Sequence, residues 1–427
     1  MKHNHQKRNV TLSKDIMINQ LISATAMYRN LPNNIYYLAV ARMILGMGNF
    51  ILPFLVLLFT DKLGYSATVA GTLAMAGTGG YLFGSFLGGR LSDRLGHKRI
   101  MVFGEFTSAV LLIVCGFFAD DPVIVPTLLL SAYFFGGLAL PASNALVADL
   151  STPKNRDAVI SLSYLAYNFG SALGPIMAGY LFWNHTEWIF FGNGVAALCC
   201  VVIVATFVRV QTGIESANDS ELEQPVSGSV WSVLRARPRL LLFTFLCGLL
   251  WYSLNQMTMA SPLYLSHVFG EQGPVIFGQL MTYACVLVVL ITPILMRLTS
   301  KKLETVSLAY AGLMFAFGYL LVMLYPTIPV HFFAWLFLSA GEVLLLTKEG
   351  VYLANNSPSS HRGRIQGVLI TLRMLFVMPS FVVIGYFIDD YGYTFTWLSV
   401  VLISLASAVG FYFMSAKAQR SPTLAID

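Results

Sequence analysis

Twelve long apolar segments, separated by short polar turns, constrain this chain more than any other feature of its sequence. A helix that crosses a lipid bilayer needs about 20 mostly apolar residues. With 56% hydrophobic and 11% charged residues, the composition is far from that of a soluble domain, in which about 25% of residues are charged. The sequence therefore predicts an all-α, polytopic membrane protein with transmembrane helices at residues 36–59, 68–88, 100–118, 124–148, 159–183, 188–208, 240–263, 275–296, 305–325, 330–354, 365–388 and 394–415.

The distribution of lysine and arginine predicts the orientation of these helices, because cytoplasmic loops carry an excess of basic residues. If the N-terminus lies in the cytoplasm, the inner segments hold 22 of the 26 basic residues and the outer loops hold one, Lys62. The other three, Arg42, Lys348 and Arg373, fall inside predicted helices. We therefore expect a multi-pass protein of the cell membrane with both termini in the cytoplasm. The net charge of +6 belongs to these loops and does not indicate nucleic-acid binding.

The two halves of the chain are related as a degenerate repeat. Transporters that work by alternating access are built from such repeats, with the substrate site at mid-membrane between them. Three positions around the end of the fourth predicted helix have counterparts 206 positions later: Pro141 corresponds to Thr347, Asp149 to Asn355 and Arg156 to Arg362. The expected organisation is an N-terminal segment at 1–35, a six-helix bundle at 36–209, a cytoplasmic linker at 210–239, a second six-helix bundle at 240–415 and a tail at 416–427.

A basic, glycine-containing segment lies between the second and third predicted helices and reads Gly-Arg-Leu-Ser-Asp-Arg-Leu-Gly-His-Lys-Arg. Its glycines permit a tight turn, and its basic residues suit the cytoplasmic membrane surface. The segment closely resembles the signature loop of the major facilitator superfamily, which implies that Asp93 latches the two halves near the start of helix 11 in the outward-facing state. The alternative is an ordinary charged inner loop. The gating residues assigned on this basis are Gly89, Arg90, Asp93, Arg94, Gly96, Lys98, Arg99, Asp149 and Arg156, with Arg90 or Arg94 as expected partners of Asp149.

The fifth predicted helix carries the glycine-proline pattern Gly170, Gly174, Pro175 and Gly179. Glycines four residues apart let helices approach closely, and a proline inside a helix removes a backbone donor. The pattern resembles the helix 5 motif of the drug/proton antiporter branch of the superfamily, although Ala178 stands where that motif usually has glycine. The resemblance implies export, and tight packing without a directional role is the alternative.

Helix 4 departs from the antiporter branch, whose members commonly carry an arginine there. No arginine occurs between Val123 and Ala148, which puts the usual arginine-assisted proton relay in doubt. Arg42 in the first helix is the candidate substitute. Its alternative role is that of an anchor whose guanidinium reaches the membrane surface.

Ionisable residues inside membrane helices are costly, and they usually face a cavity, pair with one another or take part in transport. Glu342 lies near the middle of the tenth predicted helix. It is the first candidate for proton coupling, because desolvation favours the uncharged form of a carboxylic acid. The Gly341-Glu342 pair also resembles the acidic position of some multidrug antiporters. The alternative is a structural carboxylate permanently paired with Arg373.

Other intramembrane residues are expected nearer the cytoplasmic ends of their helices. Lys348, Glu349 and Arg373 are predicted to form one inner network, in which Glu349 and Arg373 are further candidates for coupling or substrate binding, while Glu105 is expected in a gate. Aromatic faces accommodate flat apolar molecules and attract cations. The candidate cavity residues are Arg42, Asn49, Asn144, Tyr164, Tyr167, Asn168, Trp251, Tyr252, Asn255 and Gln256.

These features favour a monomeric secondary active transporter that exports hydrophobic or amphipathic compounds in exchange for protons. The alternative is a proton-coupled permease for an anionic or neutral small metabolite held by Arg42 and Arg373. An enzyme is disfavoured. The seven histidines are too scattered for a metal site, and the phosphate-binding pattern Gly-x4-Gly-Lys-Ser/Thr does not occur. We therefore expect no metal, no cofactor and an ion gradient as the energy source.

Overall fold

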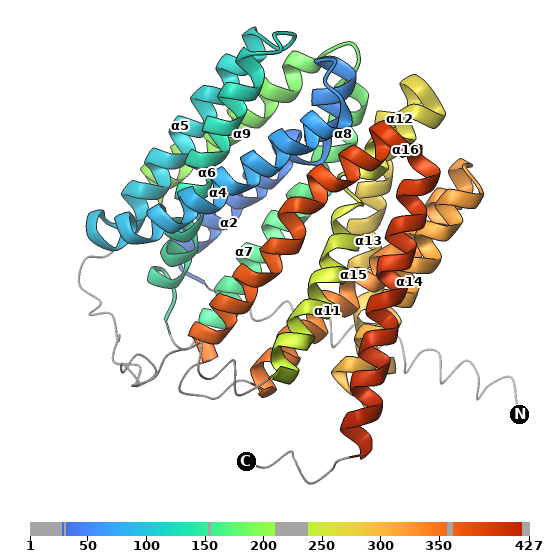
Figure 1. Cartoon of the computed structure of the whole chain (residues 1–427). Helices are drawn as coiled ribbons and strands as arrows, with labels where there is room; N and C mark the ends of the chain where they lie inside the picture. Colours follow the sequence, from blue (N-terminus) through green and yellow to red (C-terminus); the bar gives the residue numbers. More distant parts are fainter. Residues whose placement is uncertain (1–27, 30, 153–154, 210–237, 357–361, 421–427) are drawn as a thin grey trace, which may run out of the picture.

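The computed structural model describes residues 28–29, 31–152, 155–209, 238–356 and 362–420. Within these ranges every regular element is a helix, and the helices form two bundles side by side (Figure 1). The prediction of an all-α fold with two six-helix halves is confirmed. Most of the predicted linker, at 210–237, lies outside the described residues, as do residues 1–27 of the N-terminal segment and residues 421–427 of the tail.

The first bundle contains six crossings, of which the first and fifth are interrupted. The fifth breaks between α7 and α8 at the glycine-proline pattern, where Pro175 occupies the first turn of α8 and donates no backbone hydrogen bond. The helices are α2 (Asn33–Met47), α3 (Ile51–Leu57) with a π-helical turn at Leu58–Lys62, α4 (Ala67–Leu95), α5 (His97–Phe117), α6 (Ile124–Asp149), α7 (Arg156–Ser171), α8 (Gly174–Leu181) and α9 (Thr186–Phe207).

The second bundle repeats this arrangement. Its helices are α11 (Pro238–Asn255), α12 (Ala260–Phe269), a 3-10 turn at Gly270–Gln272, α13 (Gly273–Thr299), α14 (Glu304–Leu324), α15 (Ile328–Asn356) and α16 (Arg362–Arg420). The last of these holds two antiparallel helices (Figure 1), joined at Gly392 with φ 75° and ψ 176°. Only glycine adopts this conformation readily.

Eight helical stretches of the described chain are long and apolar enough to cross a membrane, and the two longest, Pro238–Thr299 and Thr371–Ala416, each contain two crossings. The α4 helix is not among these stretches, and it packs against α6 through glycines. A Cβ on Gly84 or Gly88 would come within 2.1 Å of the carbonyl oxygens of Phe134 and Leu138 on α6. Small residues therefore let α4 and α6 approach backbone to backbone.

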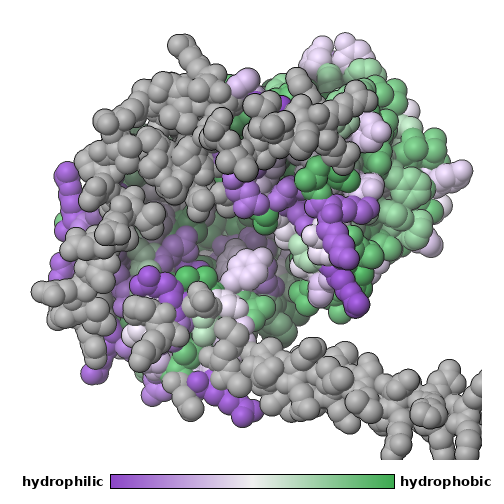
Figure 2. Space-filling view, turned by 90° about the horizontal axis from the view of Figure 1, so that it is seen from below, coloured by the Kyte–Doolittle hydropathy of each residue, from purple (hydrophilic) through white to green (hydrophobic). Residues whose placement is uncertain are grey.

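The two bundles meet at one end of the molecule and separate at the other (Figure 1). Glycines again form the seams: a Cβ on Gly71 of α4 would lie 2.2 Å from the carbonyl oxygen of Phe381 on α16, and one on Gly278 of α13 would lie 2.4 Å from that of Pro175 on α8. We call the joined end, which includes the start of α4, the closed end, and the opposite end the open end. Viewed from the open end, hydrophilic residues surround a hollow between the bundles (Figure 2).

Candidate functional site

Asp389 links the two halves at the closed end. One carboxylate oxygen accepts a hydrogen bond from the backbone N–H of Ala67 at 3.0 Å, and the other accepts from the backbone N–H of Thr68 at 2.8 Å and its hydroxyl at 2.6 Å. Ala67 and Thr68 begin α4, so their N–H groups have no partner within the helix. The positive end of the α4 dipole also favours a carboxylate there.

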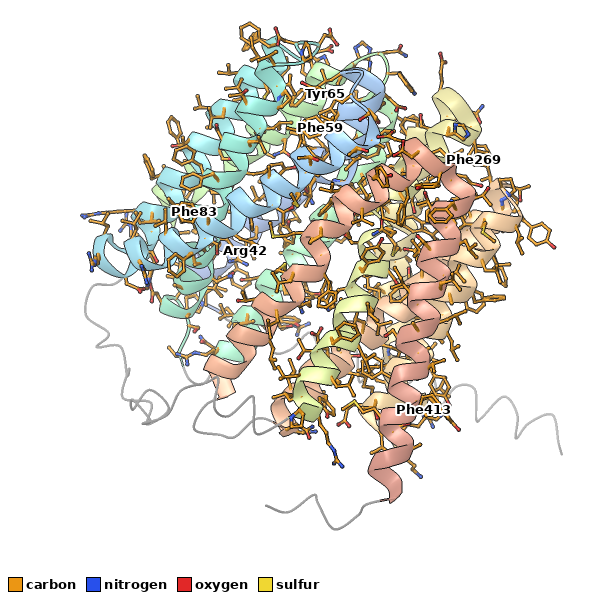
Figure 3. The ribbon with its side chains drawn as sticks, viewed as in Figure 1. Arg42, Phe59, Tyr65, Phe83, Phe269 and Phe413 are labelled. Atoms are coloured by element: carbon orange, nitrogen blue, oxygen red, sulfur yellow. The ribbon has the colours of Figure 1, made fainter. Side chains whose placement is uncertain are left out.

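Further hydrogen bonds cross between the halves. The Ser266 hydroxyl donates to the carboxylate of Asp61, the indole N–H of Trp183 donates to the carbonyl of Glu271 at 3.0 Å, and the Thr282 hydroxyl donates to the carbonyl of Ala172 at 2.6 Å. Figure 3 places Phe59, Tyr65 and Phe269 toward this end and Arg42 toward the open end. The closed end is thus held by polar contacts as well as by packed backbones.

The loop between α4 and α5 turns at Gly96, whose φ of 96° requires glycine. Asp149 contacts His97 of this loop, with Nδ1 2.7 Å from a carboxylate oxygen, rather than the expected Arg90 or Arg94. The Asp93 side chain is 77% exposed and lies 3.6 Å from His97. The partner that the resemblance implies for Asp93 is the start of the eleventh crossing, where the side chains at 362–368 lie outside the described residues, so the latch stays a prediction.

The basic residues around this loop lie at the surface of the open end. Gly89 lies inside α4, which continues to Leu95. Arg94 and Arg99 are exposed. The Arg90 guanidinium lies 4.2 Å from the ring centroid of Phe86, Lys98 Nζ donates to the carbonyls of Ala205 and Val208 at 2.9 and 2.8 Å, and Arg156 Nε donates to the Ser151 hydroxyl at 3.3 Å.

The helix 5 glycines join α7 and α8 to two different partners. A Cβ on Gly170 would lie 2.0 Å from the carbonyl oxygen of Met43 on α2, and one on Gly174 would lie 3.0 Å from that of Met47. A Cβ on Gly179 would instead lie 2.6 Å from the carbonyl oxygen of Pro274 on α13, in the other half. The pattern therefore lies where packing within one half changes to packing between halves.

Arg373, Glu349 and Trp251 form a compact cluster in the second half. Arg373 Nη1 lies 3.2 Å from Glu349 Oε2, the Trp251 indole N–H donates to the same oxygen at 2.8 Å, and the guanidinium stacks 4.1 Å from the Trp251 ring centroid. Glu349 is only 9% exposed. The structure thus brings together two members of the predicted inner network and adds Trp251, while no bond from Lys348 to this cluster occurs among the described side chains.

Glu342 lies at the midpoint of α15, fourteen residues from either end, or about 21 Å along the axis. It is partly buried. Within the described part of the chain it forms no ion pair and no hydrogen bond, because Arg373 contacts Glu349, two helical turns away, instead. The alternative of a permanent Glu342–Arg373 pair therefore does not describe this structure.

Arg42 reaches from α2 to α6. Its Nη2 donates to the hydroxyl of Ser143 at 2.8 Å and to the amide oxygen of Asn144 at 3.1 Å. Its Nε is buried without a partner among the described residues. The guanidinium thus lies against the fourth crossing, the one that lacks its own arginine.

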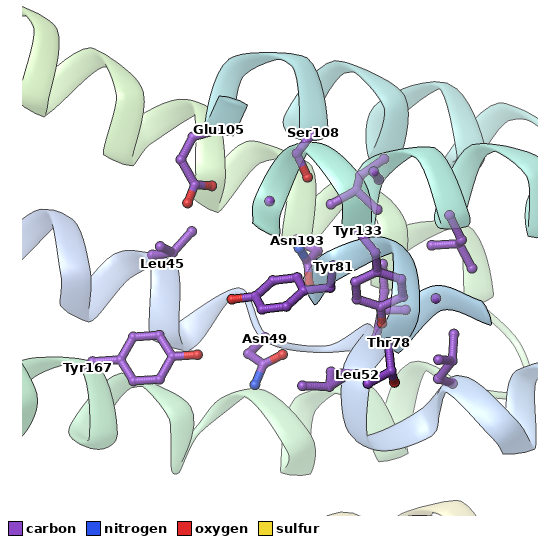
Figure 4. A pocket seen from close by; sticks show the side chains of 17 residues that line it. Leu45, Asn49, Leu52, Thr78, Tyr81, Glu105, Ser108, Tyr133, Tyr167 and Asn193 are labelled. Atoms are coloured by element: carbon purple, nitrogen blue, oxygen red, sulfur yellow. The ribbon is translucent and has the colours of Figure 1, made fainter. Parts of the chain in front are cut away.

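A cavity of about 380 Å³ lies inside the first half (Figure 4). Of the residues predicted to line a cavity, Asn49 and Tyr167 do so, and Glu105 joins them although the sequence suggested a gate. Helical spacing could have indicated more of the wall, because Thr78 and Tyr81, and likewise Glu105 and Ser108, are three residues apart and share a face. The polar lining is Asn49, Thr78, Tyr81, Glu105, Ser108, Tyr133, Tyr167 and Asn193.

The remaining predicted cavity residues lie elsewhere. Tyr164 is 66% exposed, and its carbonyl accepts a hydrogen bond from the Asn168 amide at 2.8 Å. On the seventh crossing, Tyr252 and Gln256 are buried, and Asn255 donates to the Ser380 hydroxyl on α16 at 2.8 Å. The contacts of Tyr252, Asn255 and Gln256 thus pack the second half, and the Asn168 hydrogen bond stays within α7.

Comparisons with known proteins agree with this architecture. The chain is 25% identical to the uncharacterized MFS-type transporter YttB of Bacillus subtilis (strain 168) over 84% of its own length and 89% of the relative's. It is 21% identical to a Na⁺, Li⁺, K⁺/H⁺ antiporter of Planococcus maritimus, over 85% and 91%. The crystal structure of the nucleoside transporter NupG superimposes with a TM-score of 0.72 at 15% identity, covering 90% of this chain and all of that one.

The family model of the Major Facilitator Superfamily matches residues 38–377, from the first crossing into the eleventh. This range includes the signature loop, the helix 5 pattern, Arg42 and the cluster of Arg373, Glu349 and Trp251. The relatives are transporters and not enzymes. The chain is a multi-pass membrane transporter and belongs to the major facilitator superfamily.

Proposed function

We propose that this transporter exports hydrophobic or amphipathic compounds across the cell membrane in exchange for protons. The observation that carries the proposal is Glu342, a carboxylic acid at the midpoint of α15 that has no ion-pair or hydrogen-bond partner among the described residues. A carboxylate at that depth is stable only when it is protonated or when a cation lies beside it. Proton and cationic substrate therefore compete for one group, which is the requirement for exchange.

The separated bundles provide the route to the inside. The basic loops lie at the open end, so the excess of basic residues on the cytoplasmic side favours an inward-facing arrangement. In this state Glu342 releases its proton to the cytoplasm and a substrate enters between the halves. In the outward-facing state the substrate leaves, Glu342 is protonated from outside, and Asp93 and Asp149 help to close the cytoplasmic end.

The comparisons support exchange with protons as the mode of transport. The Planococcus relative, which the chain matches over most of both lengths, is named as an antiporter of monovalent cations and protons. The glycine-proline pattern resembles the drug/proton antiporter motif, and its position between the two seams of packing is suited to coupling movements within and between the halves.

A permease for an anionic metabolite is the second candidate function. Arg42 Nε and Arg373 Nε are both buried and without a partner among the described residues, which leaves each guanidinium able to donate further. However, Glu349 already balances the charge of Arg373. An Arg373→Ala variant that also carries Glu349→Gln, so that no buried carboxylate loses its cation, separates the two: export of cationic dyes survives under the first function, and anion transport disappears under the second.

Reconstituted vesicles test the leading proposal. We expect an imposed proton gradient to drive uptake of a cationic dye into inside-out proteoliposomes, with dye-dependent proton release reported by a trapped pH indicator. Glu342→Gln should abolish uphill transport, while Glu187→Gln, which removes a surface carboxylate in the first turn of α9, should leave it intact. Full-rate uphill transport by Glu342→Gln with an unchanged response to pH contradicts the proposal.

A further inference from the structure

The cavity in the first half is separate from Glu342 and has its own chemistry. All of its lining residues come from α2 to α9 and the turn after α2, whereas Glu342 lies on α15. Its volume of about 380 Å³ is in the range of small-molecule sites, about 300–1,000 Å³. A second ligand-binding position in the first half is therefore possible on size alone.

Glu105 is the one charged side chain among the described residues that line this cavity. No ion pair or hydrogen bond to its carboxylate occurs within the described chain. Arg42, one helical turn before the lining residue Leu45, is near enough to Glu105 for a charge interaction, but its hydrogen bonds go to Ser143 and Asn144. A partly buried carboxylate without a direct partner is costly, and a positively charged ligand would remove that cost.

Phenol rings and polar atoms complete the wall around Glu105. Figure 4 shows the carboxylate of Glu105 and the hydroxyls of Tyr81 and Tyr167 turned toward the cavity. The Tyr133 hydroxyl is buried and has no partner among the described residues, so it can donate to a ligand. Tyrosine faces attract cations, most strongly where water is excluded.

The size and composition of the cavity distinguish an organic cation from a metal ion. Calcium needs six to eight oxygen ligands at about 2.3–2.6 Å and magnesium needs six at about 2.0–2.1 Å, whereas here a single carboxylate lies in a space large enough for a molecule. Clusters of three or more His, Cys, Asp or Glu side chains do not occur among the described residues. An ammonium group with an apolar or aromatic body would place its charge at Glu105 and its body against the tyrosines and leucines.

We propose that this cavity is a binding site for small organic ammonium ions, with Glu105 as the counter-ion and the Tyr81, Tyr133 and Tyr167 rings as its aromatic walls. The inference rests on the proposed function, because it names a substrate class and a second site for the same exporter. It adds a recognition site for the cation in the first half to Glu342 in the second half, where the cation competes with the proton.

Equilibrium binding to the full-length protein in lipid nanodiscs tests the site, with benzyltrimethylammonium as the probe and its uncharged isostere neopentylbenzene as the comparison. We expect the cation to bind at least about tenfold more tightly than the isostere, as for a desolvated charge pair. Glu105→Gln should remove that preference, and Glu187→Gln should retain it. Equal affinity of the two ligands for the wild type, or an undiminished preference in Glu105→Gln, overturns the inference.

A second variant keeps the test independent of the charge. Thr78→Met adds side-chain volume to the wall while leaving Glu105 in place, and it should weaken both ligands. Unchanged binding of both would place the ligands elsewhere and would overturn the inference. The binding assay uses no proton gradient, so its result tests the Glu105 site alone. The coupling role of Glu342 is tested separately by the vesicle assay.

Discussion

Removing the Asp389 carboxylate is expected to open the closed end. Asp389 accepts three hydrogen bonds from the first two residues of α4, at 2.6–3.0 Å, across the boundary between the halves. Hydrogen bonds to charged groups contribute about 1.5–3 kcal/mol each in buried sites. A carboxylate at a helix N-terminus contributes about 0.3–1 kcal/mol when exposed.

Asp389 is exposed to solvent, so the low end of these ranges applies, and we take about 2 kcal/mol for the whole contact. A free-energy change of about 1.4 kcal/mol corresponds to a factor of ten in an equilibrium constant. Asp389→Ala should therefore increase the population of molecules in which the closed end has opened about 30-fold relative to those in which it stays shut. Asp390→Ala is the matched control, because its carboxylate is adjacent in the chain and makes no contact with α4 among the described residues.

Distances between spin labels provide the assay. Labels at Asp120 in the first half and Tyr325 in the second are both on exposed residues near the closed end, in a background without the five native cysteines. Pulsed electron resonance should show a second, longer distance population in Asp389→Ala and a single population in the wild type and in Asp390→Ala. Identical distance distributions in all three proteins would refute the contribution assigned to Asp389.

Three further changes have expected outcomes. Arg373→Ala leaves the buried Glu349 carboxylate without its cation and should destabilise the protein by about 3–5 kcal/mol, and adding Glu349→Gln should recover much of the lost melting temperature. Gly71→Val forces a side chain against a backbone carbonyl at the seam between the halves and should abolish transport, whereas Gly80→Ala, whose Cβ would have 3.8 Å of space, should be tolerated. Hydrogen bonds from the backbone N–H groups at the start of α6 lower the pKa of Asp121. The ionised carboxylate therefore stabilises the folded protein above the pKa that Asp121 has in the unfolded chain, and this effect is lost as the pH falls through its lower pKa in the folded protein. Asp121→Ala should lower the melting temperature at pH 7 but not in strong acid.

The sequence predicts the helices and their pairing into halves because these depend on local properties. The length of each apolar run sets a crossing, and Gly392 and the glycine-proline pattern mark turns and breaks through backbone geometry alone. The all-α fold and the two bundles follow directly from these features. The breaks within the first and seventh crossings were not predicted, although each is followed by a proline in the first turn of the next helix, Pro53 of α3 and Pro262 of α12.

Contacts between helices are harder to predict, because sequence fixes depth along a helix but not which neighbour each face meets. Glu342 and Glu349 are seven residues apart and share a face of α15, so either could have met Arg373. The structure selects Glu349, and Trp251 adds a hydrogen bond and a stacked ring to the same cluster. Glu105 illustrates the same difficulty: its distance from the helix end suggested a gate, and only the packing of six crossings shows that it lines a cavity.

The contact of Asp389 with α4 suggests how the two states are balanced. Asp389 lies at the closed-end terminus of the eleventh crossing and bonds the N-terminus of α4. Asp93 lies at the opposite end of α4, and the resemblance to the signature loop assigns it the start of the eleventh crossing in the other state. Each carboxylate would then stabilise one state through the same helix pair, with similar free energies.

Such opposed contributions would leave the two states within a few kcal/mol of each other, with the closed end favoured in the wild type, so that binding of a proton or substrate, with differential affinities of a few kcal/mol, could reverse the ratio. Asp93→Ala should therefore favour the inward-facing state by about the amount that Asp389→Ala disfavours it, roughly 30-fold by the same arithmetic. The double variant should return the spin-label distances to the wild-type ratio. A double variant that remains as open at the closed end as Asp389→Ala alone would show that Asp93 does not oppose it.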